Sequence, residues 1–171
     1  MDAFYAWVDP QVRFVIALFL GLGLLMVEIV PRIYSFTAQP ASGTMRPLSE
    51  AQIRFDVVAK AQSYLNLPYK FGGNDPRGFD CSGLVMYLYG LHGFTMPHGV
   101  IQMRPRLKPT RTPRMGDVIF FLNDNRIAGH VGIYVDAETF IHAPRENTVI
   151  RYEKLKHPYW QKRLVEVRSV M

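Results

Sequence analysis

One cysteine, at position 81, stands in this chain of 171 residues. A single cysteine excludes a disulfide within the chain, so cysteine usage does not indicate a redox compartment. The sequence also lacks internal repeats and low-complexity segments, and no recognised nucleic-acid-binding motif accompanies its formal net charge of +6. Among the anionic partners that suit a basic chain, nucleic acid is therefore disfavoured relative to anionic lipid and an acidic wall polymer.

The remaining composition is that of a globular protein, with 49% hydrophobic and 20% charged residues. The length suits one domain of about 100–150 residues with an appendage. Basic residues are dispersed, and we interpret their one loose cluster as a solvated loop face rather than a specific site. That cluster consists of Arg104, Arg106, Lys108, Arg111 and Arg114.

An apolar run begins at position 14 and ends at Pro31, interrupted only by Glu28. Its length falls between the core of a signal peptide, about 7–15 residues, and a spanning helix of about 20 residues. No cysteine follows it for lipoprotein processing, and a small-x-small sequence comes only at 41–43. We predict that 14–30 forms an uncleaved single-pass signal anchor, with a cleaved signal peptide as the alternative.

The lone cysteine lies where a turn segment rich in glycine and proline changes to helical periodicity. Asp80 is the predicted N-cap, and Cys81 falls in the first helical turn, where unpaired amides and the helix dipole favour a thiolate. Most free cysteines are small buried apolar side chains, which is the alternative interpretation. A cysteine nucleophile needs a base and a group that orients the base, and His130 and His142 lie downstream in strand-like runs.

The order of predicted elements is helices first and strands afterwards, which indicates an α+β domain. A capping box at 49–52 begins a helix that ends at 66–68, and a short helix is expected around 98–103. Short turns favour antiparallel pairing of the strands that follow. The strand candidates are 117–122, 127–135, 140–143, 148–152 and 164–170.

His130 and His142 then fall on neighbouring antiparallel strands. They share a face of the sheet only if the residue numbers of each cross-strand pair add up to an even number. The sequence leaves this register open. The two histidines make a weak metal site, because no further ligand arrives at suitable spacing, and we predict neither a metal nor another cofactor. The other three histidines are interpreted as loop residues; they are His92, His98 and His157.

Four sequence blocks resemble the NlpC/P60 family of cell-wall cysteine peptidases, in family order over roughly residues 50–168. The matching blocks are Tyr69…Gly72-Gly73…Phe79-Asp80-Cys81-Ser82-Gly83-Leu84, Gly116-Asp117-Val118-Ile119-Phe120-Phe121, His130-Val131-Gly132-Ile133-Tyr134 and Phe140-Ile141-His142-Ala143. The resemblance implies a papain-like fold, with N-terminal helices packed on a five-stranded, mainly antiparallel sheet. Here the hydrophobic N-terminal helix precedes that fold.

The resemblance also implies the roles of the site residues. The catalytic set is Cys81 as nucleophile, His130 as base and His142 as the orienting group. Three further residues are implied to hold the oxyanion or the substrate: Tyr69, Asp80 and Ser82. Judged from the residues alone, Tyr69 is equally a packing residue of its turn, and Asp80 is equally only a helix cap.

The activity implied by the resemblance is hydrolysis of the peptidoglycan stem peptide, typically at the γ-D-glutamyl bond to a diamino acid. The expected organisation is an anchor and linker over 1–48 and a catalytic domain over 49–171. The anchor is expected to make the membrane a partner and to hold the domain on the wall side of a bacterial cytoplasmic membrane. The sequence leaves any protein partner open. The alternatives are an amidase of the CHAP type or a transacylase on the same scaffold, and a membrane-tethered, non-catalytic wall-binding or assembly scaffold.

Overall fold

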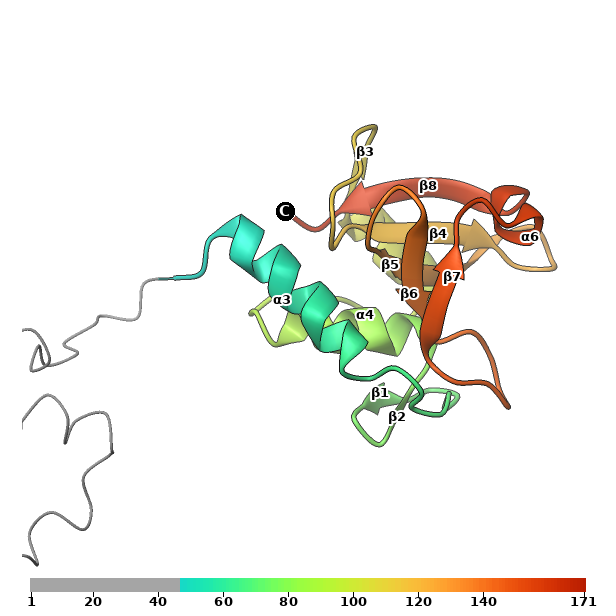
Figure 1. The fold of residues 1–171 in the computed structure, drawn as a ribbon, viewed down its shortest axis with the longest axis horizontal. Coiled ribbons are helices and arrows are strands. Elements are labelled where there is room, and N and C mark those ends of the chain that lie inside the picture. Colours follow the sequence, from blue (N-terminus) through green and yellow to red (C-terminus); the bar gives the residue numbers. More distant parts are fainter. Residues whose placement is uncertain (1–46) are drawn as a thin grey trace, which may run out of the picture. The chain divides into compact units, whose positions relative to one another are not determined.

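The computed structural model describes residues 47–171, and the predicted anchor at 14–30 lies outside them. Within 47–171, no helix is both long and apolar enough to cross a membrane. Figure 1 shows the helices and strands in chain order. Their bounds are α3 (Glu50–Gln62), β1 (Asn74–Asp75), β2 (Gly78–Phe79), α4 (Cys81–Gly90), α5 (Val100–Met103), the 3₁₀ helix η1 (Arg104–Arg106), β3 (Lys108–Thr110), β4 (Val118–Leu122), β5 (Ala128–Tyr134), β6 (Thr139–His142), β7 (Arg151–Lys154), α6 (Pro158–Gln161) and β8 (Leu164–Ser169).

The main sheet has six strands in the order β3-β8-β4-β5-β6-β7, and every neighbouring pair is antiparallel. The sequence prediction of five strands was therefore one short. The additional strand is β3, which lies in a proline-rich span outside the strand candidates. Pro109 lacks a backbone donor, and it is accommodated because β3 is an edge strand.

A second difference concerns the start of β7, which was predicted at 148 and begins at Arg151. The intervening residues pair with the segment that follows α3 instead of with β6. Val149 forms an isolated bridge with Pro68, and Tyr69 N–H donates to the carbonyl of Thr148 at 2.9 Å. These hydrogen bonds draw the chain out of the sheet and bring Tyr69 close to the turn before β7.

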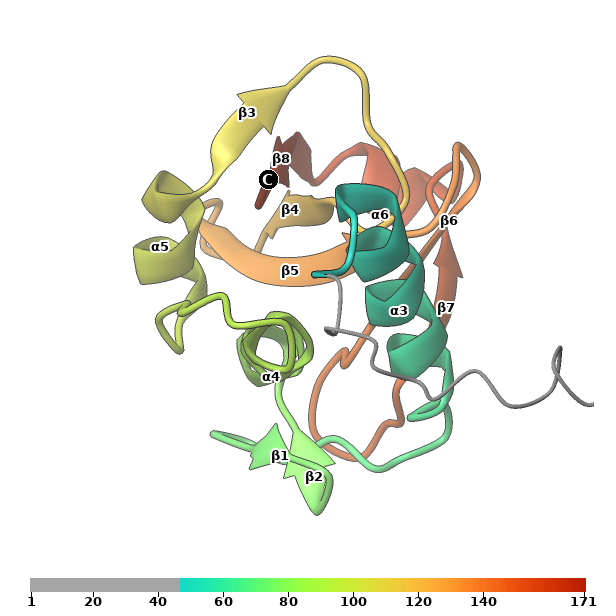
Figure 2. The ribbon, with the colours of Figure 1, turned by 90° about the vertical axis from the view of Figure 1, so that its left-hand side faces the viewer.

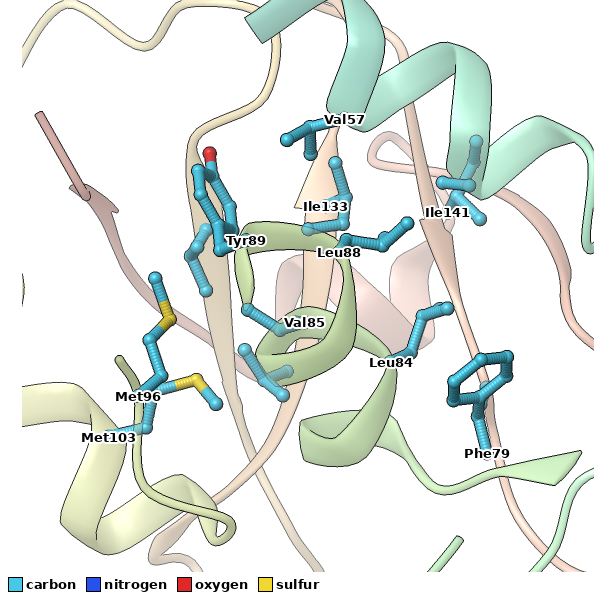
Figure 3. Close-up of a cluster of buried hydrophobic side chains, with 14 of the residues drawn as sticks. Val57, Phe79, Leu84, Val85, Leu88, Tyr89, Met96, Met103, Ile133 and Ile141 are labelled. Carbon is cyan, nitrogen blue, oxygen red and sulfur yellow. The ribbon is translucent and has the colours of Figure 1, made fainter. Parts of the chain in front are cut away.

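Each face of the sheet has its own apolar core. On one face, α3 and α4 pack against alternating residues of β4, β5 and β6, as Figure 2 shows with α4 viewed along its axis. Figure 3 shows this core, in which Leu84, Leu88 and Tyr89 of α4 meet Ile133 and Ile141 of the sheet. On the other face, α6 contributes to a smaller cluster, which consists of Ile119, Phe121, Phe140, Trp160 and Val167.

The predicted capping box begins α3 as expected: Ser49 accepts from the backbone of Gln52, whose side chain accepts from the Ser49 N–H. This helix also carries the main buried ion pair of the domain. Arg54 Nη1 lies 2.6 Å from Asp117 Oδ1, just before β4, and Arg54 Nη2 donates to Ser169 Oγ at 2.7 Å. Arg54 therefore connects the helical layer to two central strands.

The start of α4 is fixed by close backbone packing. A Cβ at Gly83 would overlap the carbonyl oxygen of Gly73, so only glycine permits the first turn of α4 to lie against the preceding turn segment. Phe79, immediately upstream, is fully buried and packs against Tyr64 and Tyr87. The position of Cys81 is therefore determined by packing on both sides of it.

The Arg54–Asp117 pair predicts a large loss of stability when one partner is neutralised. Asp117→Asn should lower the free energy of unfolding by about 3–5 kcal/mol, because it removes the buried counter-charge of Arg54 and leaves only the exposed partner Glu50. Glu50→Gln removes the exposed partner of the same arginine and should leave the denaturation midpoint nearly unchanged. Chemical denaturation of both variants measures the difference, and equal, small shifts would contradict a stabilising role for the buried pair.

Candidate active site

Cys81 is the first residue of α4, and Asp80 is the N-cap, as predicted. Asp80 Oδ1 accepts from the Gly83 N–H at 2.7 Å and from the Ser82 hydroxyl at 3.0 Å. One carboxylate oxygen thus satisfies a free amide of the first turn and holds the neighbouring serine. This arrangement presents the cysteine side chain at a defined point beside β5.

His130 and His142 come together on one face of the sheet. The register pairs Ile133 with Ile141 and Tyr134 with Phe140, so paired positions sum to an even number and both histidines point the same way. His130 Nε2 lies 2.7 Å from His142 Nδ1, with the two rings nearly perpendicular at 81°. The register of β5 and β6 therefore allows the two histidines to contact each other, a point that the sequence left open.

A glycine makes this pairing possible. Gly132 lies on the same face as His130, two residues along β5, and His142 crosses above it. A Cβ at Gly132 would lie 2.8 Å from Phe140 Cδ2 and 3.2 Å from His142 Cβ, closer than the packing allows. The His-Val-Gly sequence therefore supplies both the imidazole and the space for its partner.

An aromatic wall surrounds the two imidazoles. The indole of Trp160 stacks on His130 at an interplanar angle of 26° and meets His142 at 86°. Phe121 and Phe140 complete the contact with the two rings. His142 is fully buried, and its Nε2 has no hydrogen-bond partner among residues 47–171. Such packing restricts rotation of both rings and buries His142 completely, while His130 remains partly exposed.

The thiol of Cys81 is held in its neutral form. Burial, followed by the negative charge of Asp80, raises the pKa of Cys81 to about 11, and the backbone amides of Val131, Ser82 and Cys81 only partly oppose this rise. The expectation that the helix start favours a thiolate is thus wrong for the unliganded site, because burial and the Asp80 charge outweigh the amides. Val131 directly follows His130, so the sulfur lies beside the strand residue next to the imidazole.

The imidazoles are also neutral at rest. Burial lowers the pKa of His130 to about 4. Burial, then the charges of His130 and Arg151, lower the pKa of His142 well below its usual value. Among the described residues no hydrogen bond joins the Cys81 thiol to either ring, and contacts of this kind often tighten only when substrate binds. The resting site therefore holds a neutral thiol and two neutral rings.

The structure brings Tyr69 to the same site. Burial, followed by the charges of Cys81, Asp80 and Glu146, raises the pKa of the Tyr69 hydroxyl to about 12. A hydroxyl with this pKa stays protonated and can donate a hydrogen bond over the whole neutral range. Of the residues proposed from the sequence, Asp80, Ser82 and Tyr69 thus lie around the cysteine, while His142 lies behind His130.

Sequence reasoning missed one residue of this group. His98, interpreted as a loop residue, places its Nε2 2.8 Å from Asp80 Oδ2, so it binds the carboxylate oxygen that the α4 cap leaves free. It is partly exposed, with 30% of its side chain accessible. The two residues are 18 positions apart, and nothing in local periodicity relates them. The one relevant feature of the sequence was the short helix expected around 98–103, which the structure forms as α5 from Val100.

Comparison with known proteins identifies the family. The model of the NlpC/P60 family matches residues 66–169, and this chain belongs to that family. The murein DD-endopeptidase MepH of Escherichia coli is 36% identical over 141 residues, which are 77% of this chain and 52% of that protein. The gamma-DL-glutamyl hydrolase of Bacillus subtilis is 37% identical over 119 residues, which are 66% of this chain and 28% of that protein. The chain spans about half or less of the length of these curated relatives.

Solved structures bear out the fold. An NlpC/P60 family protein from Bacillus cereus superimposes with a TM-score of 0.64 at 27% identity, covering 68% of this chain and 40% of that one. The NlpC/P60 domain of the peptidoglycan hydrolase SagA gives a TM-score of 0.57 at 26% identity, covering 69% of this chain and 98% of that domain. The α+β fold of the NlpC/P60 family, predicted from the sequence, is confirmed.

The raised pKa of Cys81 predicts slow alkylation at neutral pH. With a pKa of about 11, roughly one thiol in a thousand is ionised at pH 8, so the iodoacetamide rate should rise about tenfold per pH unit up to about pH 10. Asp80→Asn retains a helix cap and removes the nearby negative charge, so it should lower the pKa and speed alkylation at pH 8. Asp56→Asn, the same change on α3, is the matched control.

Mass spectrometry of the alkylated protein over a pH series measures these rates. A rate that stays constant from pH 5 to pH 9 would contradict the neutral resting thiol, because a preformed thiolate–imidazolium pair behaves in that way. Equal rates for Asp80→Asn and the unchanged protein would contradict the contribution assigned to the Asp80 charge.

Proposed function

We propose that this chain is a cysteine endopeptidase that hydrolyses peptidoglycan stem peptides through Cys81, His130 and His142. The observation that carries the proposal is the 2.7 Å contact between His130 on β5 and His142 on β6, with the Cys81 sulfur beside Val131 of β5. The relatives named as peptidoglycan endopeptidases support the class of substrate. The expected division into an anchor and linker (1–48) and a catalytic domain (49–171) belongs to the same proposal.

In the proposed reaction, His130 takes the proton of the Cys81 thiol as the sulfur attacks the scissile carbonyl carbon. The carbon–nitrogen bond then breaks, and His130 returns the proton to the departing amine, leaving a thioester on Cys81. Water, deprotonated by the same imidazole, cleaves the thioester and restores the thiol. In this cycle His130 Nε2–H donates to His142 Nδ1, which leaves His130 Nδ1 free to act as the base.

The negative charge that develops on the carbonyl oxygen requires donors already in place. The backbone N–H of Cys81, at the start of α4, is one proposed donor. The hydroxyl of Tyr69 is the second, and its high pKa keeps its proton available. Asp80 and Ser82 are proposed to contact the acyl side of the substrate, while Asp80 also caps α4.

The proposed bond is the one between γ-D-glutamate and the diamino acid of the stem peptide. Relatives are named for both DD- and DL-endopeptidase activity, so the bond is the part of the proposal that needs its own assay. A wall digest analysed for new amino termini distinguishes the γ-D-glutamyl bond from a D,D cross-link. The same digest separates an endopeptidase from a CHAP-type amidase, a transacylase or a non-catalytic scaffold.

The catalytic assignment predicts unequal losses of turnover. Cys81→Ala and His130→Ala should each lower kcat by at least about 10⁴-fold, because members of one catalytic unit do not contribute additively. His142→Gln should cost about 10²-fold, since it disturbs orientation without removing the base. Kinetics on a soluble wall peptide measure all three variants. Wild-type turnover by Cys81→Ala refutes the mechanism, and a larger loss at His142 than at His130 reverses the two roles.

We also propose that residues 14–30 anchor the protein in the cytoplasmic membrane, with the catalytic domain on the wall side. The apolar run and the absence of a nearby small-x-small sequence support an uncleaved anchor. The mature protein should therefore be recovered in the membrane fraction with this segment intact. N-terminal mass spectrometry measures it, and a mature chain that begins between Tyr34 and Thr44 would identify a cleaved signal instead.

A further inference from the structure

A cavity of about 550 Å³ opens beside His130, on the sheet face that carries α6. His130 and Trp160 line it, the turn after β4 contributes Asn123, and the turn after β6 contributes Arg145. Cys81 is not among the residues that line it. Of the proposed catalytic residues, only the base therefore faces this space.

The position of the cavity determines which half of a substrate it can receive. His130 is the group that returns a proton to the departing amine, so a space lined by His130 and not by Cys81 lies on the leaving-group side. The acyl half is proposed to contact Tyr69, Asp80 and Ser82, none of which lines the cavity. This assignment rests on the proposed function.

The charges that line the cavity are mostly paired with each other or with nearby groups. Arg151 lies 2.8 Å from Glu153, and Asp124 lies 3.1 Å from Arg163, which is outside the lining. The exception is Arg145, whose guanidinium has no ion-pair partner within residues 47–171. The cavity thus contains one positive charge without an ion-pair partner among the described residues, that of Arg145, near the proposed base His130.

The backbone beneath Arg145 is held firmly. Its N–H donates to Thr148 Oγ1 at 3.2 Å, and the same hydroxyl donates to the Arg145 carbonyl. These two hydrogen bonds close the turn, so the backbone that carries the exposed Arg145 side chain is fixed. A guanidinium on a fixed backbone suits bidentate recognition of a carboxylate.

We propose that this cavity is a carboxylate-binding subsite for the leaving fragment of the wall peptide, with Arg145 as the residue that recognises the carboxylate. A free carboxylate on the released diamino acid pairs with the guanidinium, and Trp160 packs against the apolar part of that fragment. Arg145 then distinguishes a free carboxylate from its amide, because an uncharged amide cannot form the charge-assisted pair.

Such binding also assists the chemistry. Burial keeps the pKa of His130 at about 4, which makes the free imidazole a weak base. An anion bound in the adjacent cavity favours the protonated ring and so raises that pKa as the thiol proton moves. The bound substrate thereby strengthens the base that takes the thiol proton.

The test uses two probes that differ only at the lysine carboxyl group: L-alanyl-γ-D-glutamyl-L-lysine with a free lysine α-carboxylate, and the same tripeptide with a lysine carboxamide. For the free carboxylate, Arg145→Ala should lower kcat/KM by about 10- to 100-fold, and Arg145→Lys should recover part of the loss. For the carboxamide, Arg145→Ala should have the same kcat/KM as the unchanged protein. Arg111→Ala removes an exposed guanidinium from the turn between β3 and β4 and should alter neither probe.

Equal losses on both probes, or no loss on either, would overturn the subsite. Binding of both probes to the Cys81→Ala protein tests the subsite without turnover: a preference for the carboxylate that Arg145→Ala abolishes supports it, and equal binding overturns it. If the unchanged protein cleaves neither probe yet shows this preference, the proposed bond is wrong and the subsite stands.

Discussion

The Asp80 carboxylate is the interaction on which the rest of the site depends. One oxygen caps α4 and holds Ser82, and the other binds His98. The first contact fixes where the cysteine lies, and the negative charge raises the thiol pKa. Asp80 therefore stabilises the geometry of the site while opposing ionisation of the Cys81 thiol. His98 is the side chain that contacts this carboxylate, through its Nε2.

Burial is the second constraint, and it favours the neutral form of Cys81, His130 and His142 alike. It raises the pKa of Cys81 and lowers those of His130 and His142, so the resting site carries no charge on these side chains. The aromatic wall around Trp160 contributes to the burial of both imidazoles. In the proposed reaction, charge appears only during turnover, when the Tyr69 hydroxyl stabilises the oxyanion and the anionic leaving fragment stabilises protonated His130.

Much of the fold and site was predictable because local signals agreed with the global fold. The capping box at Ser49, the Asp80 cap and the position of Cys81 follow from short-range hydrogen bonding that the sequence reveals directly. The missed strand β3 depended on edge pairing with β8, which no local pattern encodes. The contact of His98 with Asp80, like the shared face of the histidine pair, depends on register and chain path between distant segments. The raised thiol pKa depends on burial, which a helix-dipole argument omits.

The most direct measurement of the central claim is the mass of the protein during turnover. Rapid quenching after mixing with a stem peptide should reveal a transient mass increase equal to the acyl half of the substrate. Peptide mapping should locate it on Cys81 as a thioester. An adduct on any other residue, or turnover during which the protein mass never changes, would contradict covalent catalysis by Cys81.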